Sequence, residues 1–224
     1  MERVLGNLSF DAFLHDWMVV TLKKPVLKGR VMYAEFKRFA ADSSLPRMER
    51  TRNLLANMLE YAKYYAAIKG VAAAGSGDMN VDRRLESIQK LGSTVTDPLV
   101  MYMFAAWKRD RVSVMDCCAC LRILNRICSA EMICSVSSNG LNKLVPSLIA
   151  KLESAEDDSA ETFAALLITE TAKAHAWPTD SEFRQALLGE NLYRPAWRCK
   201  YLLAGLENYN HPKDPRSSER IHHR

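Results

Sequence analysis

The chain has 224 residues, of which 48% are hydrophobic and 25% charged, and its formal net charge is +5, which is an ordinary globular composition. Its apolar residues form short clusters broken by charges, and no run approaches the roughly 20 apolar residues that a membrane-spanning helix needs. The first six residues also lack the basic segment and apolar block of a secretory signal, so we expect a soluble, cytoplasmic protein.

Apolar residues recur at intervals of three or four positions throughout the chain, which predicts helices. Glycine and proline are scarce, with nine and eight residues, and they lie between these segments. We therefore predict an all-α fold, an irregular bundle of about nine or ten helices with no sheet. The expected helices contain residues 9–22, 33–40, 47–69, 81–91, 98–108, 113–128, 141–152 and 163–168, a segment that starts near 178–182, and residues 201–206.

A run of small residues, 70–77, interrupts this pattern and offers no large side chain that could anchor it in a core. It predicts a flexible loop over residues 71–80, between N-terminal helices in 1–70 and a main helical bundle in 81–210. The polar residues 211–224 contain two prolines, and we expect them to be disordered.

The positive charge is concentrated near the N-terminus, where residues 1–70 contain twelve Lys and Arg against seven Asp and Glu. Such a cluster can bind DNA phosphates by charge neutralisation and counterion release, which makes duplex DNA a candidate partner. A solvated connection is the alternative interpretation. The candidate contacts are Lys23, Lys24, Lys28 and Arg30, joined by Lys37 and Arg38.

The cysteine pattern does not predict disulfides or a metal site. Most of the six cysteines lie in one apolar stretch, whereas a disulfide framework spreads its cysteines among the loops of a small secreted domain. Cys117 and Cys120 form one Cys-x-x-Cys, but no second ligand pair follows at the spacing that zinc requires. We expect reduced, buried thiols at Cys117, Cys118, Cys120, Cys128, Cys134 and Cys199.

No catalytic signature occurs in the chain: there is no Gly-rich phosphate loop, no His-Glu-x-x-His and no Gly-x-Ser-x-Gly. His15 is expected on the exposed polar side of its helix. Asp157 and Asp158 are adjacent acids at a helix start, where the helix dipole favours negative charge, so we interpret them as a cap. We expect no catalytic residue, metal or cofactor.

Six segments carry a family resemblance through their order and spacing. Together they resemble the helical region of GmrSD-type, modification-dependent DNA restriction endonucleases. The segments are 6–14 (Gly-Asn-Leu-Ser-Phe-Asp-Ala-Phe-Leu), 33–37 (Tyr-Ala-Glu-Phe-Lys), 61–65 (Tyr-Ala-Lys-Tyr-Tyr), 138–143 (Ser-Asn-Gly-Leu-Asn-Lys), 177–183 (Trp-Pro-Thr-Asp-Ser-Glu-Phe) and 198–207 (Arg-Cys-Lys-Tyr-Leu-Leu-Ala-Gly-Leu-Glu).

The resemblance implies a scaffold role. The family joins an N-terminal ParB-like, NTP-hydrolysing domain to a C-terminal His-Asn-His-type nuclease, and the catalytic signatures of both are missing here. The implied partners are those two domains or subunits, duplex DNA and a second copy of the chain. Asn139, Asn142 and Lys143 are the polar residues of interest in the matching segment, with helix capping and a solvated lysine as the alternative. Family members have an Arg pair where this chain has Ala130 and Glu131.

Two other functions remain open. The chain could be a stand-alone helical interaction or regulatory protein that partners a separate nuclease subunit, or an enzyme with an unfamiliar helical active site. A neighbouring reading frame that begins with a Glu-His-Ile motif would indicate a split restriction enzyme.

Overall fold

The computed structural model describes residues 2–42, 46–71, 75–135, 139–174, 178–189, 192–194 and 196–210. Within these ranges the chain forms eleven helices and no strand, which confirms the predicted all-α fold. The helices are α1 (Glu2–Leu5), α2 (Phe10–Leu22), α3 (Arg30–Ala41), α4 (Arg47–Ile68), α5 (Met79–Lys90), α6 (Asp97–Lys108), α7 (Val114–Ile133), α8 (Asn139–Ser154), α9 (Ala160–Ala174), α10 (Asp180–Gly189) and α11 (Ala196–Asn210).

Side-chain caps fix several helix starts. Asp78 accepts hydrogen bonds from the backbone N–H groups of the first turn of α5, and the Ser113 hydroxyl accepts one from the first turn of α7. Before α10, Thr179 and Glu182 form a capping box, in which each side chain accepts a hydrogen bond from the backbone N–H of the other residue. The expected tail, 211–224, lies outside the described residues.

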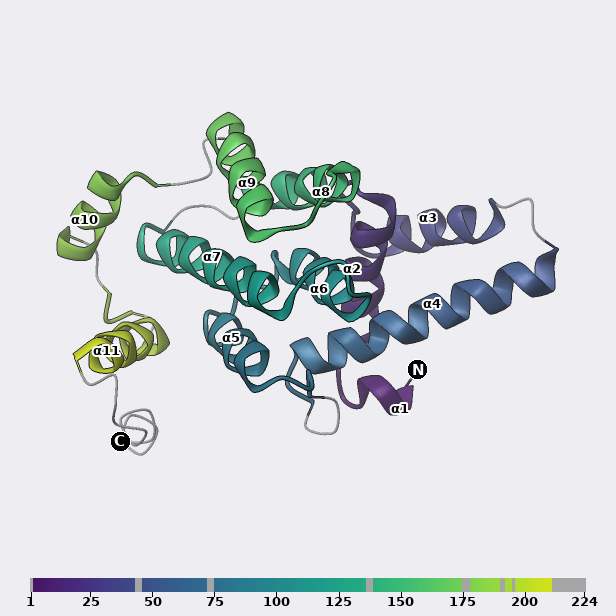
Figure 1. Ribbon diagram of the computed structural model, residues 1–224, viewed down its shortest axis with the longest axis horizontal. Helices are drawn as coiled ribbons and strands as arrows, with labels where there is room; N and C mark the ends of the chain where they lie inside the picture. Colours follow the sequence, from purple (N-terminus) through teal and green to yellow (C-terminus); the bar gives the residue numbers. More distant parts are fainter. Residues whose placement is uncertain are drawn as a thin grey trace.

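Helix α6 occupies the centre of the molecule, and ten consecutive residues, from Asp97 to Ala106, are buried. It packs against α2, α4, α7 and α8, while α5 and α9 pack against α7 (Figure 1). Buried residues before and after the expected loop at 71–80 belong to one hydrophobic cluster. The two parts of the chain therefore share a core.

Two pieces of the molecule extend away from this core, at opposite ends of the view in Figure 1. At one end, α3 and the first half of α4 run side by side; α3 buries only Met32, and the buried residues of α4 begin at Met58. We call residues 23–52 the α3–α4 arm. At the other end lie α10, which buries no described residue, and α11, whose Tyr201 hydroxyl is 2.9 Å from the Ser129 hydroxyl of α7.

None of the helices in the described ranges is both long and apolar enough to cross a membrane.

Candidate functional site

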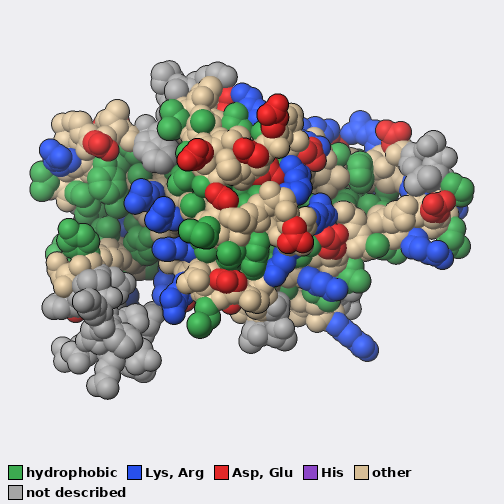
Figure 2. All heavy atoms as spheres, viewed as in Figure 1, with side chains coloured by type: hydrophobic (Ala, Val, Ile, Leu, Met, Phe, Trp, Pro, Cys, Tyr) green, Lys and Arg blue, Asp and Glu red, His purple; other side chains and the backbone are tan. Residues whose placement is uncertain are grey.

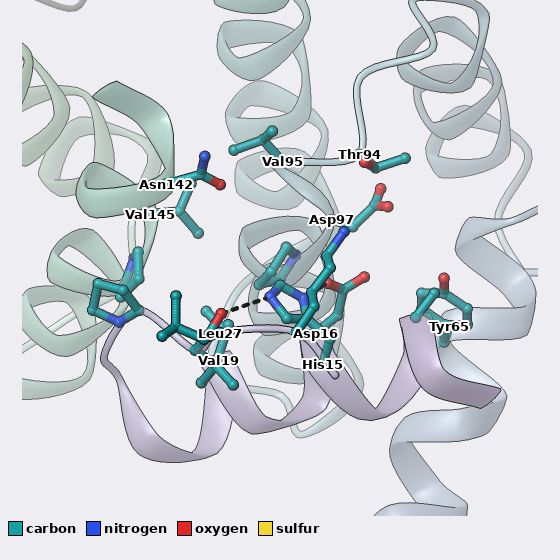
Figure 3. A pocket seen from close by; sticks show the side chains of 16 residues that line it. His15, Asp16, Val19, Leu27, Tyr65, Thr94, Val95, Asp97, Asn142 and Val145 are labelled. Atoms are coloured by element: carbon teal, nitrogen blue, oxygen red, sulfur yellow. Dashed lines mark hydrogen bonds and ion pairs between the residues drawn. The ribbon is translucent and has the colours of Figure 1, made fainter. Parts of the chain in front are cut away.

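A cavity of about 600 Å³ lies between α2, the connection from α2 to α3, the start of α6 and α8. Three of the segments that carry the resemblance contribute to its lining, through Ala12, Tyr65 and Asn142. Lys28, one of the predicted DNA contacts, also lines it. Figure 3 shows Asn142 and Asp97 on opposite sides of the cavity. Residues far apart in the sequence thus meet at one polar site.

His15 makes two hydrogen bonds at this cavity. Its Nε2 lies 3.1 Å from the backbone carbonyl oxygen of Val26, which can only accept, so Nε2 carries a proton (dashed line in Figure 3). Its Nδ1 lies 2.8 Å from Oδ1 of Asp16. An unprotonated nitrogen facing a carboxylate oxygen at this distance would be repulsive, so a proton lies between them. The pair is either an imidazolium beside a carboxylate or a neutral ring beside a carboxylic acid.

A second buried carboxyl, Asp97, forms an ion pair with Lys69. Only 4% of Asp97 is exposed. Burial raises the pKa of Asp97 to about 6, against the opposing effect of Lys69. Burial also raises the pKa of Asp16, against the effect of its hydrogen bond to His15. The charge of Lys28 favours the ionised form of both carboxyls, which places the lysine near the two acids.

These groups supply donors, acceptors and a shared proton, but no recognisable nucleophile. No hydroxyl or thiol forms a hydrogen bond with His15 among the described residues. No group of three His, Cys, Asp or Glu side chains in the described ranges is placed to hold a metal ion. The arrangement is suited to binding through hydrogen bonds and charge.

The structure separates the predicted basic cluster into three groups. Lys23 forms an ion pair with Glu153, while Lys24 donates to Glu35 at 2.8 Å and Arg38 approaches the same carboxylate at 3.6 Å. Lys28 lies at the cavity. Arg30 and Lys37, both exposed on α3, have no acidic partner within the described part of the chain. DNA contact by these six residues stays a prediction.

The α3–α4 arm is strongly basic as a whole. Residues 23–52 contain nine Lys and Arg against three Asp and Glu, an excess of six cations, while the whole chain has a net charge of +5. Arg47 and Arg52 extend the positive charge onto the first half of α4, where both are exposed. The net charge of the arm therefore exceeds that of the whole chain.

The motif residues of α8 occupy different environments. Helix α8 begins at Asn139, whose side chain lies outside the described residues, and Lys143 is exposed. Asn142 lines the cavity. Glu131 is 7% exposed, and its Oε1 has no hydrogen-bond partner among the described residues. Burial raises the pKa of Glu131 to about 7.

Two expectations for individual residues were wrong. His15 is not on an exposed side of its helix, because α2 is buried on most of its circumference and even Asp16 is covered. Asp157 does accept hydrogen bonds from Ser159 beside the start of α9, as expected for a cap. Asp158 instead turns inward, accepting a hydrogen bond from Tyr102.

The cysteines are free thiols, as expected, but the expectation of burial is wrong for half of them: Cys117, Cys120 and Cys128 are buried, whereas Cys118, Cys134 and Cys199 are partly exposed. Burial raises the pKa of Cys117 to about 12 and that of Cys128 to about 11, so neither is a thiolate near neutral pH.

Comparisons with known proteins do not identify the chain. No protein-family model matches it, and no curated protein or solved structure matches it at a significant level.

Proposed function

We propose that this chain is the helical scaffold of a GmrSD-type, modification-dependent DNA restriction system and that its α3–α4 arm contacts the DNA backbone. The order and spacing of the six family-like segments support the restriction assignment. The observation that carries the DNA contact is the charge of the arm: residues 23–52 have an excess of six cations, and they include α3 and the exposed start of α4.

The arm suits a sequence-independent contact. Arg30 and Lys37 are seven residues apart on α3, which places them on one side of the helix, about two turns apart. Since neither has an acidic partner among the described residues, their charges are available to phosphates. Such contacts neutralise the backbone without reading bases, so they hold DNA in position while another domain supplies specificity and chemistry.

The placement of the two extensions supports the scaffold role. The basic arm lies at one end of the helical core, and α10 and α11 lie at the other (Figure 1). A rigid core between two separate attachment points sets the distance between an NTP-hydrolysing domain and a nuclease domain.

The proposed DNA contact is tested by a mobility-shift titration of the chain against duplex DNA over a salt series. We expect the Arg30→Gln, Lys37→Gln double variant to bind more weakly, with a salt slope reduced by roughly two units, equally for modified and unmodified duplexes. The matched control is Arg83→Gln, Arg84→Gln, which removes the same charge from exposed positions on α5. Equal effects of both double variants, or no binding at low salt, would contradict a contact through the arm.

A protein-interaction role is the second candidate, because large apolar side chains remain exposed on and between α10 and α11. Figure 2 shows hydrophobic side chains gathered over these two helices, at the left of the view. Co-purification with the product of a neighbouring nuclease gene would support this role, while a chain that purifies alone and binds DNA would favour the first. The exposed residues are Leu187, Leu188, Tyr193, Trp197, Leu203, Leu206 and Tyr209.

A further inference from the structure

A second, smaller cavity of about 210 Å³ lies between α2, α4, α6 and the connection that follows α6. Three cations, Lys23, Arg109 and Arg111, line it against a single acid, Glu153. The residues that line it are therefore mainly cationic, although each cation is paired with an acid. In the larger cavity two acids face Lys28.

The two arginines that line the cavity, Arg109 and Arg111, form ion pairs with Glu60 and Asp158, which lie outside the lining. Arg109 donates from Nε and Nη2 to the two carboxylate oxygens of Glu60, each at 3.2 Å. Arg111 Nη2 lies 2.8 Å from Asp158 Oδ2, as an ion pair without good hydrogen-bond alignment. The Arg109 guanidinium also lies over the Tyr61 ring, 5.3 Å from its centroid. These contacts fix both side chains, and each guanidinium has five N–H donors, more than these contacts use.

Neutral donors complete the lining. The indole N–H of Trp17 donates to Oδ1 of Asn57 at 2.9 Å, which fixes the orientation of the amide and leaves its NH2 group without a role in that bond. Asn57 and Tyr61 both line the cavity from α4. Polar residues of α4 therefore accompany the arginines of the connection after α6.

We propose that this cavity binds a phosphate group. Its volume is below the range of about 300 to 1,000 Å³ that is typical for drug-sized ligands, so it suits a single phosphate group better than a whole nucleotide. Planar guanidinium forks match the oxygens of phosphate in pairs, and the ammonium of Lys23 adds a point charge. The ion pair of Lys23 with Glu153 would open to admit the ligand.

The proposal is tested by titrating the full chain with inorganic phosphate, followed by calorimetry, against chloride at equal ionic strength. We expect saturable binding of phosphate. Asn57→Asp keeps an acceptor for the Trp17 N–H but places a negative charge at the cavity, so it should lower the affinity by at least about tenfold. Asn53→Asp is the matched control: it lies one turn earlier on α4, is exposed and does not line this cavity.

A second variant keeps the test valid if Asn57→Asp fails to fold. Arg109→Gln removes a half-exposed cation and should also weaken phosphate binding several-fold, while circular dichroism should show an unchanged helical spectrum. The proposal is overturned if the parent shows no saturable response to phosphate, or if both Asn57→Asp and Arg109→Gln bind it as the parent does.

Two sources of the phosphate group can be distinguished. If the group belongs to a DNA backbone, inorganic phosphate should compete with duplex DNA at constant ionic strength, and Asn57→Asp should weaken duplex binding. If the ligand is free phosphate or a small monoester, duplex binding should not change. The inference does not depend on DNA contact by the α3–α4 arm, because the Arg30→Gln, Lys37→Gln variant should bind inorganic phosphate as the parent does.

Discussion

At the scale of single residues, Glu131 should make stability depend on pH. Its folded pKa of about 7 exceeds the ordinary value of 4.5, so the folded protein binds the proton more tightly between these pH values. The resulting stabilisation is complete below about pH 4.5 and is lost as the pH rises through 7. Glu131→Gln stays neutral, so at pH 8 it should exceed the parent by about 1 to 3 kcal/mol in free energy of unfolding.

Urea denaturation at pH 5 and pH 8 measures this difference. The difference in free energy of unfolding between Glu131→Gln and the parent should be smaller at pH 5 than at pH 8. The control Glu161→Gln, an exposed change on α9, should show no such pH dependence. A constant difference between the variant and the parent at the two pH values would contradict the assignment.

The free energy of unfolding should fall more when the His15 ring is removed than when the charge of Asp16 is removed. His15→Ala leaves the buried carboxyl of Asp16 without its partner and should cost about 1 to 3 kcal/mol. Asp16→Asn can still donate an N–H to a neutral ring at Nδ1, so its cost should be smaller. Urea denaturation of the two variants at pH 7 makes the comparison, and a larger loss for Asp16→Asn would mean that the pair is stabilised mainly by charge.

At the scale of elements, α10 should open more readily than the helices of the core. It buries no described residue, while α6 buries ten in succession, and local opening costs least where few apolar contacts are lost. Amide hydrogen exchange should therefore be fast in α10 and in α3, and slowest in α6. Protection of α10 equal to that of α6 would show that α10 is covered in solution, by a partner or a second copy.

Helix positions could largely be predicted from the sequence, because the signals are local. Asp78 and Ser113 cap α5 and α7, and their hydrogen bonds span only a few residues. The single turn of α1 was missed, since four residues are too few to show a period.

The candidate sites were harder to predict, because they depend on contacts between distant segments. The ion pair of Arg111 with Asp158 joins residues 47 positions apart, and no local pattern indicates it. His15 was misplaced for a related reason: an apolar stripe predicts which side of a helix is buried only when the other side meets water, and α2 is enclosed. The adjacent acid at Asp16 was the available signal.

At the scale of the whole molecule, the cysteines should report on global unfolding. Cys117, Cys120 and Cys128 are buried and belong to α7, in the core, whereas Cys118, Cys134 and Cys199 are partly exposed. A thiol reagent should label at most three cysteines in the native protein and all six in urea. If the three buried cysteines were labelled without denaturant as fast as the partly exposed ones, α7 would have to open locally.

The shared core also determines how the chain could be divided. Apolar side chains from α2 and α4 pack with those of α6, α7 and α8 in one cluster, although the expected loop at 71–80 separates them in sequence. A backbone cut between residues 71 and 75 would leave two pieces, each exposing the half of the interior that the other had covered. Neither piece should be stable alone, but the two should reassemble when mixed, so this position offers a split site at which reconstitution of the protein can be made conditional on bringing two fused partners together.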